Sequence, residues 1–259
     1  MKCLKICFIA LAVSCNSSSV KKAPVMQGAY FMTSQTVNSG DQTNKSTTLK
    51  QLKIYTAKFM MYAQVNPEDS SSRFGVGSYT TDTSGVTENV IYSSGDSSFD
   101  DSPATYKLDV TTNPDGYNQV ISGMVIGGEK STLTEEYQRS GTRVETPMDG
   151  VWKEMEAYNV NGNDTLRKKR TQYKAFFDGY FMFGHTLQDS SGTHTGIGFG
   201  TFSMDGNHKM KETDLNSTYS IIAGQSFMID VELTGADHFK QTIVEPNGVK
   251  DVEIYERLK

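Results

Sequence analysis

The chain has no cysteine after Cys15, because all three of its cysteines lie in the first fifteen of 259 residues. A framework of disulfides in the rest of the chain is therefore excluded. No apolar run after residue 15 is long enough to span a bilayer as a helix. Basic residues are also scarce, with 25 against 30 acidic ones, whereas nucleic-acid-binding proteins usually have the opposite balance.

The residues that are abundant favour a β-rich protein. Proline is rare, with 6 residues, whereas glycine (23), tyrosine (13) and phenylalanine (13) are frequent, and hydrophobic residues make up 36%. Aromatic residues are enriched in strands, and glycine is frequent in the turns between them. The length allows one large domain or two of ordinary size.

The first fifteen residues have the pattern of a signal peptide. Lys2 and Lys5 precede an apolar stretch over residues 6–13, and the small Ser14 stands just before Cys15. The sequence Ala-Val-Ser-Cys at 12–15 resembles the lipobox of bacterial lipoproteins, although Ala12 stands where Leu, Val or Ile is usual. The resemblance implies that residues 1–14 are removed and that Cys15 is lipidated.

The alternative is an ordinary secretory signal that is cut elsewhere. Lipidation is favoured because Cys3 and Cys7 would leave with the signal, so Cys15 would have no disulfide partner in the mature chain. Residues 15–24 are polar and predict a flexible tether. We therefore expect an exported protein of the bacterial cell envelope, attached to a membrane through its N-terminal lipid.

An internal repeat with a period near 121 residues runs through the rest of the chain. Five anchors recur in the same order: GAY (28–30) with GVW (150–152), KIY…FMMYA (53–63) with KAF…YFMFG (174–184), FGVGSY (74–79) with IGFGTF (197–202), YKLDV (106–110) with FMIDV (227–231), and EEYQR (135–139) with EIYER (253–257). The repeat predicts two domains, 25–140 and 149–259, joined by a linker at 141–148.

Each repeat has short apolar and aromatic runs separated by turn signals, which indicates either a sandwich or an up-and-down barrel. Repeat two begins with Gly150 and Trp152 and ends with Arg257. This pair of ends resembles the signature of the lipocalin and wider calycin family. The resemblance implies an eight-stranded barrel in which the arginine of the last strand packs across the tryptophan of the first.

Repeat one has the same signature in a weaker form, with Gly28, Tyr30 and Arg139 at the corresponding positions. The predicted fold is therefore all-β, with two tandem up-and-down lipocalin-like barrels. A pair of β-sandwiches is the alternative, and it would need no link between first and last strands.

The strands FMMY (59–62) and YFMF (180–183) carry the candidates for ligand binding. Alternate residues of a barrel strand point inward, and an eight-stranded barrel is either filled or just wide enough for one small ligand. Phe59, Met61, Tyr180 and Met182 are the residues that would line such a pocket. The same residues could equally fill a packed interior.

Three other patterns each allow a functional and a structural interpretation. The glycine strands at 74–79 and 196–202 could be phosphate loops, but no helix pattern follows them, which favours bent barrel strands. His185 and His194 could be metal ligands with Asp189, or scattered loop and strand-end histidines. The basic run 167–170 could meet an anionic ligand, or it could be a solvated edge.

No catalytic constellation is recognisable. Asp109 and Asp230 align between the repeats and could face inward or outward, and Glu88 and Glu212 also align, after the glycine strands. The sequence favours an envelope lipoprotein that binds a small apolar or amphipathic ligand, with no cofactor, metal or nucleic acid. The alternatives are a structural module with filled barrels that contacts another envelope protein, and an enzyme on the same scaffold.

Overall fold

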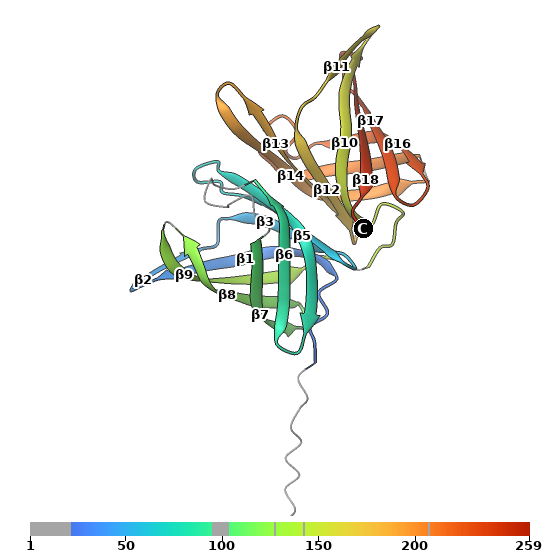
Figure 1. The fold of residues 1–259 in the computed structure, drawn as a ribbon. Coiled ribbons are helices and arrows are strands. Elements are labelled where there is room, and N and C mark those ends of the chain that lie inside the picture. Colours follow the sequence, from blue (N-terminus) through green and yellow to red (C-terminus); the bar gives the residue numbers. More distant parts are fainter. Residues whose placement is uncertain (1–21, 95–103, 127, 142, 207) are drawn as a thin grey trace, which may run out of the picture.

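The computed structural model describes residues 22–94, 104–126, 128–141, 143–206 and 208–259. All the regular elements in these ranges are β-strands (Figure 1). The predicted signal peptide and Cys15 lie outside the described residues. Within the described part of the chain, no helix has the length and apolar character needed to cross a membrane.

The first repeat forms an antiparallel sheet that closes on itself. Strand order is β2-β1-β3-β4-β5-β6-β7-β8-β9, and β1 also pairs with β9. The strands are β1 (Gly28–Ser39), β2 (Gln42–Ser46), β3 (Lys50–Tyr55), β4 (Phe59–Val65), β5 (Ser72–Asp82), β6 (Gly85–Ser93), β7 (Ala104–Asn113), β8 (Gly116–Ile126) and β9 (Glu129–Arg139). Eight strands make the barrel, and β2 extends the far half of β1 as a hairpin.

The second repeat forms a second closed sheet with the same connections. Strand order is β11-β10-β12-β13-β14-β15-β16-β17-β18, and β10 pairs with β18. The strands are β10 (Gly150–Asn161), β11 (Asp164–Arg167), β12 (Thr171–Phe177), β13 (Tyr180–Asp189), β14 (Gly192–Asp205), β15 (Lys209–Ser217), β16 (Ser226–Thr234), β17 (His238–Val244) and β18 (Lys250–Arg257). Pairing between first and last strands rules out the sandwich alternative.

The two barrels share irregularities as well as strand order. A bulge interrupts β1 between Met32 and Ser34, and another interrupts β10 between Glu154 and Glu156, at the corresponding place. Because a bulge is a local feature that families keep, its recurrence supports the duplication. The prediction of two tandem up-and-down barrels is confirmed.

A cation–aromatic contact lies at the closed end of barrel two. Trp152 is directly opposite Arg257 in the pairing of β10 with β18. The guanidinium carbon lies 3.9 Å from the centroid of the indole ring, and the indole Nε1 donates a 2.8 Å hydrogen bond to the carbonyl of Met148. Arg257 also donates to the carbonyl of Pro147 at 2.9 Å. These contacts join the first strand, the last strand and the linker.

Gly150 is required by this arrangement. Its φ of +146° is a conformation that residues with a side chain rarely adopt, and an added Cβ would lie 2.2 Å from Arg257 Nη1. Barrel one has the looser version, in which the guanidinium of Arg139 lies 5.9 Å from the Tyr30 ring. Tyr30 and Arg139 are again directly opposite each other in the strand pairing.

The glycine strands are barrel strands β5 and β14, and no helix follows them, so they are not phosphate loops. Gly77 and Gly200 stand at equivalent bulges where the neighbouring strand approaches closely. A Cβ on Gly77 would lie 2.2 Å from the carbonyl oxygen of Asn89, and one on Gly200 would lie 1.9 Å from that of Thr213. Glycine is present because no side chain fits there.

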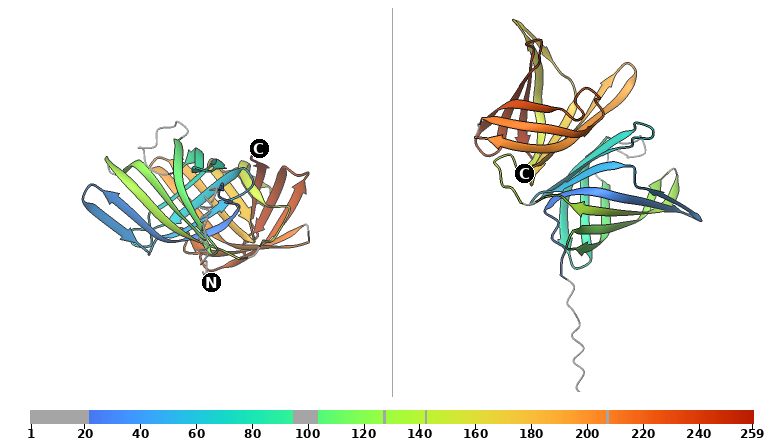
Figure 2. Two further views of the ribbon diagram at one scale, coloured as in Figure 1. Left: turned by 90° about the horizontal axis from the view of Figure 1, so that it is seen from below. Right: turned by 180° about the vertical axis from the view of Figure 1, so that it is seen from behind.

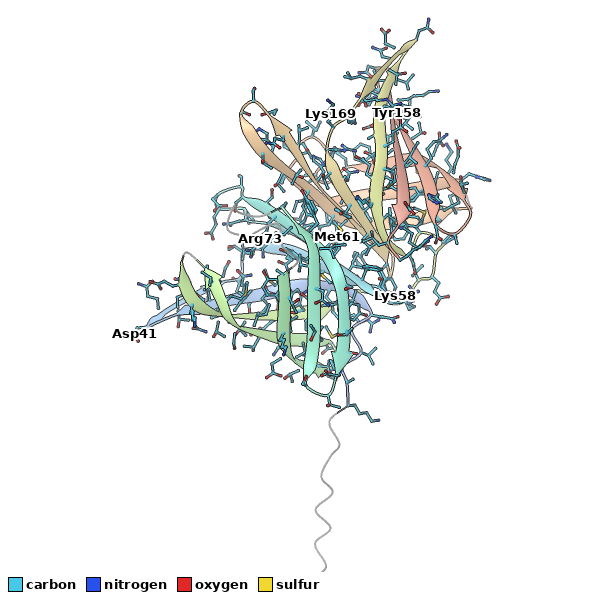
Figure 3. The ribbon with its side chains drawn as sticks, in the orientation of Figure 1. Asp41, Lys58, Met61, Arg73, Tyr158 and Lys169 are labelled. Atoms are coloured by element: carbon cyan, nitrogen blue, oxygen red, sulfur yellow. The ribbon has the colours of Figure 1, made fainter. Side chains whose placement is uncertain are left out.

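The barrels pack against each other through the outer faces of β3–β5 and β12–β14 (Figure 2). These strands are buried on both faces, as the unbroken burial of β3 and β12 shows. Met61, labelled in Figure 3, is fully buried in this contact. Met182 is also fully buried there, and Phe59 and Tyr180 pack against the same cluster. The four expected pocket residues therefore point away from the barrel interiors.

The sequence does not reveal this outward orientation, and the reason is simple. A strand that is buried on both faces shows no alternation of apolar and polar residues, so the sequence does not reveal which residues face inward. The neighbours Met60 and Phe181 are the ones that belong to the interior clusters. The aromatic and methionine enrichment of these strands reflects the contact between barrels.

We predict that Trp152 and Arg257 stabilise barrel two as a coupled pair. Trp152→Ala should lower the free energy of unfolding by about 3–5 kcal/mol. Combined with Arg257→Ala, it should show an interaction free energy of about 0.5–3 kcal/mol, because the two side chains share one contact. Urea unfolding followed by circular dichroism of the two single variants and the double variant measures this coupling.

Additive losses of unfolding free energy in the double variant would contradict the prediction. Tyr30→Ala with Arg139→Ala is the matched pair in barrel one, where weaker coupling is expected because the two groups are 5.9 Å apart.

Candidate functional site

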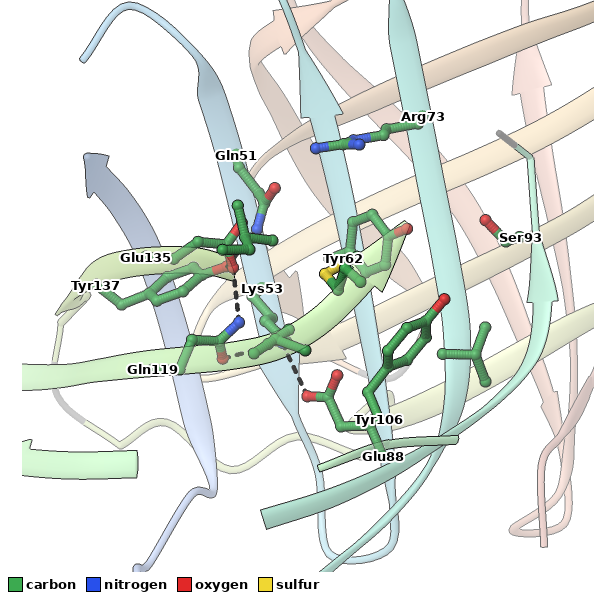
Figure 4. A pocket seen from close by; sticks show the side chains of 14 residues that line it. Gln51, Lys53, Tyr62, Arg73, Glu88, Ser93, Tyr106, Gln119, Glu135 and Tyr137 are labelled. Carbon is green, nitrogen blue, oxygen red and sulfur yellow. Dashed lines mark hydrogen bonds and ion pairs between the residues drawn. The ribbon is translucent and has the colours of Figure 1, made fainter. Parts of the chain in front are cut away.

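Each barrel interior is apolar at its closed end and polar in its middle. In barrel one, Lys53 of β3 is ion-paired with Glu88 of β6 at 2.8 Å, and both are almost fully buried (Figure 4). Glu135 accepts hydrogen bonds from Gln119 at 2.6 Å and from Tyr137 at 2.8 Å. Buried charges need such partners, because burial without them is costly.

Barrel two repeats this polar cluster almost residue for residue. Lys174 is ion-paired with Glu212 at 2.8 Å and donates to Gln241 at 3.1 Å. Gln241 in turn donates to Glu253 at 2.6 Å, and Tyr255 donates to the same carboxylate at 2.5 Å. The two copies thus share a buried network of lysine, two glutamates, glutamine and tyrosine.

The two interiors differ greatly in free volume. The pocket of barrel one measures about 80 Å³, whereas the open cavity of barrel two measures about 770 Å³. The exposed Arg73 lies beside the pocket of barrel one (Figure 4), and its Nε donates at 2.7 Å to Gln64, the residue opposite it on the neighbouring strand. Strand pairing aligns Gly196 with Arg73, and in barrel two the Tyr219 hydroxyl and the His185 ring lie against this glycine.

The cavity of barrel two opens at the end away from Trp152. Phe176 packs near that closed end, at 6.2 Å from Phe239, which itself lies 4.7 Å from the Trp152 ring. Lys174 and Gln172 follow along β12 toward the opening, and the basic run 168–170 lies there. The apolar lining consists of Phe183, Ile222, Phe227, Ile229 and Ile243, together with Leu187 and Ile221, whose side chains are also exposed to solvent.

The basic run is partly inside the site and is only partly a solvated edge. Arg170 is largely buried and pairs with Glu154 at 2.6 Å and with Glu253 at 2.5 Å. Lys168 pairs with Asp251 at 2.5 Å. Burial raises the pKa of the Glu253 carboxyl, but Arg170 and Lys174 outweigh it and hold the pKa at about 2. These ion pairs hold the side chains at the opening of barrel two in place.

His185 lines the cavity and takes part in the network. Its Nδ1 lies 3.1 Å from Gln172 Oε1, and its Nε2 lies 2.7 Å from the Tyr219 hydroxyl. Burial, with a contribution from Arg170, lowers the pKa of His185 to about 4, so the ring is neutral at pH 7. Strand pairing aligns it with Gln64 of barrel one.

The histidines do not gather around one point. His194 is exposed, and its Nε2 lies 3.2 Å from Asp189 and 2.8 Å from the Ser191 hydroxyl, apart from the partners of His185. Across the described ranges, no group of three or more His, Cys, Asp or Glu residues could hold a metal ion.

Asp214 is the residue that most distinguishes the cavity of barrel two. It is 3% exposed and lines the cavity, and its Oδ1 has no hydrogen-bond partner. Burial raises the pKa of Asp214 to about 7, and the charge of Glu212 adds to the rise. Val90 is its counterpart in barrel one, since Gly77 pairs with Val90 as Gly200 pairs with Asp214.

Of the aligned carboxylates in the sequence, one pair faces inward and the other does not. Glu88 and Glu212 are buried partners of the interior lysines. Asp109 and Asp230 alternate with the buried residues of β7 and β16, and so they lie on the outer faces. The aligned lysines 53 and 174, which sequence reasoning treated only as anchors of the repeat, were the missed signal of the interior cluster.

A scan against models of known protein families finds no match for this chain, and a search of curated proteins finds no relative.

We predict that Asp214 makes stability depend on pH in a characteristic direction. Its folded pKa of about 7 lies above the ordinary value of 3.8, so the folded state binds the proton more tightly. Between these values, its contribution to the free energy of unfolding therefore falls as pH rises. Asp214→Asn removes this term, so the variant should gain stability relative to the wild type between pH 4.5 and 7.5. Urea midpoints at both pH values measure the gain, with Asp230→Asn as the surface control; an equal difference at the two values would contradict the prediction.

Proposed function

We propose that the protein is a lipocalin-like envelope lipoprotein whose second barrel binds a small amphipathic ligand. The observation that carries the proposal is the cavity of about 770 Å³ inside barrel two. Small-molecule sites typically measure roughly 300–1,000 Å³ and combine apolar walls with a few polar groups. The apolar wall and the polar cluster of this cavity fit that description.

The two barrels have different roles in this proposal. With about 80 Å³ of free volume, barrel one is nearly filled by its own side chains. Its outer face packs on β12–β14, which support the wall of the cavity in barrel two. Barrel one therefore serves as a structural module that stiffens barrel two. For this half of the chain, the alternative of an interaction module with a filled barrel is retained.

The attachment to a membrane rests on the sequence of the first fifteen residues. The charged start, the short apolar stretch and Cys15 in a lipobox-like context support export followed by lipidation. The polar tether would leave the barrels free to meet ligands close to the membrane surface. The family resemblance rests on the residue pair at each closed end, Trp152 with Arg257 and Tyr30 with Arg139.

We predict that filling the cavity abolishes ligand binding. The neutral apolar dye N-phenyl-1-naphthylamine should gain fluorescence with one site per chain, and Ile243→Trp should reduce its affinity about tenfold or more by occupying the cavity. Ile243 lines the cavity, whereas its neighbour Val244 is exposed on the outer face. Val244→Trp is therefore the matched control and should bind the dye as the wild type does. A wild type that does not bind the dye would disprove the ligand-binding proposal.

We predict that Cys15→Ser releases the protein from the membrane. Without its thiol, residue 15 cannot accept the lipid, and the tether that follows has no apolar run to replace it. Immunoblots of membrane and soluble fractions from cells expressing each form measure the effect. Ser14→Ala, which keeps a small residue beside Cys15, is the control and should stay in the membrane fraction. A Cys15→Ser variant that remains there would show that the lipobox assignment is wrong.

A further inference from the structure

The cavity of barrel two holds one more buried carboxylate than the equivalent space of barrel one. Both barrels have the buried ion pair of lysine and glutamate, at 2.8 Å in each. Barrel one has no further carboxylate at the position of Asp214, because Val90 stands there. The duplication thus provides an internal reference, and against it Asp214 is an added charge without an added partner.

The existing cations of barrel two are already committed elsewhere. Lys174 is bonded to Glu212 and Gln241, and Arg170 is shared between Glu154 and Glu253. Lys168 pairs with Asp251. No ion pair within the described ranges includes Asp214. Its Oδ1 is shielded from water and has no hydrogen-bond partner, which is costly for a buried charged group.

The local structure makes room for this carboxylate. Gly198 of β14 faces it, and a Cβ at that position would lie 2.9 Å from Asp214 Oδ1. The aromatic ring of Phe183 lies against the same face of Gly198, at 2.4 Å from that Cβ position. The carboxylate is therefore held in a packed setting beside an apolar wall, at a fixed place in the cavity.

The charges around the cavity favour a cation. Its lining includes four basic side chains and five acidic ones, so acid is in excess even with the basic run at the opening. Of the four basic residues, Lys169 contributes least to the charge inside the cavity, because its side chain is exposed to solvent. Lys174 acts on Asp214 only through its longer-range charge. A positive group on a ligand would therefore meet a carboxylate with no ion-pair or hydrogen-bond partner at Oδ1, whereas an anion there would meet cations that are already paired.

We propose that the ligand of barrel two is an amphipathic amine, whose protonated nitrogen donates to Asp214 while its apolar part packs against Phe227, Ile229 and Ile243. This inference rests on the proposed ligand-binding function and specifies its chemical class. An ammonium supplies both the missing positive charge and the missing donor, and a neutral hydroxyl supplies only the donor. A charge-assisted hydrogen bond in a dry site is stronger than a neutral one.

The test compares three twelve-carbon probes that differ only in their head group. Dodecylamine, dodecanol and dodecyl sulfate, each below its micelle concentration at pH 7.5, are made to displace N-phenyl-1-naphthylamine from the full chain. We expect dodecylamine to compete about tenfold more strongly than dodecanol. In Asp214→Asn this preference should disappear while dodecanol binding stays unchanged.

Control variants separate the possible outcomes. Asp230→Asn removes the same charge from the outer face and should keep the preference for the amine; Asp214→Val, with the residue of barrel one, should lose it. Circular dichroism and dye binding verify that each variant is folded. A wild type that binds the dye but does not prefer the amine would overturn this inference alone, whereas absence of dye binding would overturn the proposed function. Strongest competition by dodecyl sulfate would also overturn the inference and place the head group at the basic opening.

Discussion

The pairing of the first strand with the last is the constraint on which the rest of the structure depends. An open sheet of this length would leave two edges with unpaired backbone groups, and closure removes both. The contact of Trp152 with Arg257 lies at the point where β10 meets β18, and it also holds the linker carbonyls. Once the sheet is closed, half of the residues of each strand must face one small interior, and their volumes decide whether that interior is filled or hollow.

Closure also explains why the interior contains charged residues. The lysine–glutamate pairs and the glutamine bridges span strands far apart in the sequence, such as β3 with β6 and β12 with β15. Apolar side chains would fill the same space with less desolvation cost, so these networks hold polar groups at fixed places. In barrel one that network is complete. In barrel two the same scaffold carries an additional carboxylate and a cavity beside it.

The duplication allows the second barrel to be compared position by position with the first. Aligned positions that agree, such as Lys53 with Lys174, belong to the shared fold. Aligned positions that differ, such as Val90 with Asp214, distinguish the two interiors, of which the second has the larger cavity and the additional carboxylate. The contact between the barrels uses the outer faces of equivalent strands, so one side of barrel two is backed by a packed neighbour.

The sequence by itself determined the duplication, the all-β class and the residue pairs that close each barrel, because these depend on local patterns and on the ends of each repeat. The alignment of Glu88 with Glu212 is likewise visible in the sequence, but their inward orientation is not. Only the tertiary structure decided which residues line the cavity. Met61 and Met182 lie on strands that are buried on both faces, where the alternation of apolar and polar residues disappears. Both side chains lie on the outer face, in the contact between the barrels. Free volume is likewise a property of many side chains together, so no local pattern distinguishes the filled barrel from the hollow one.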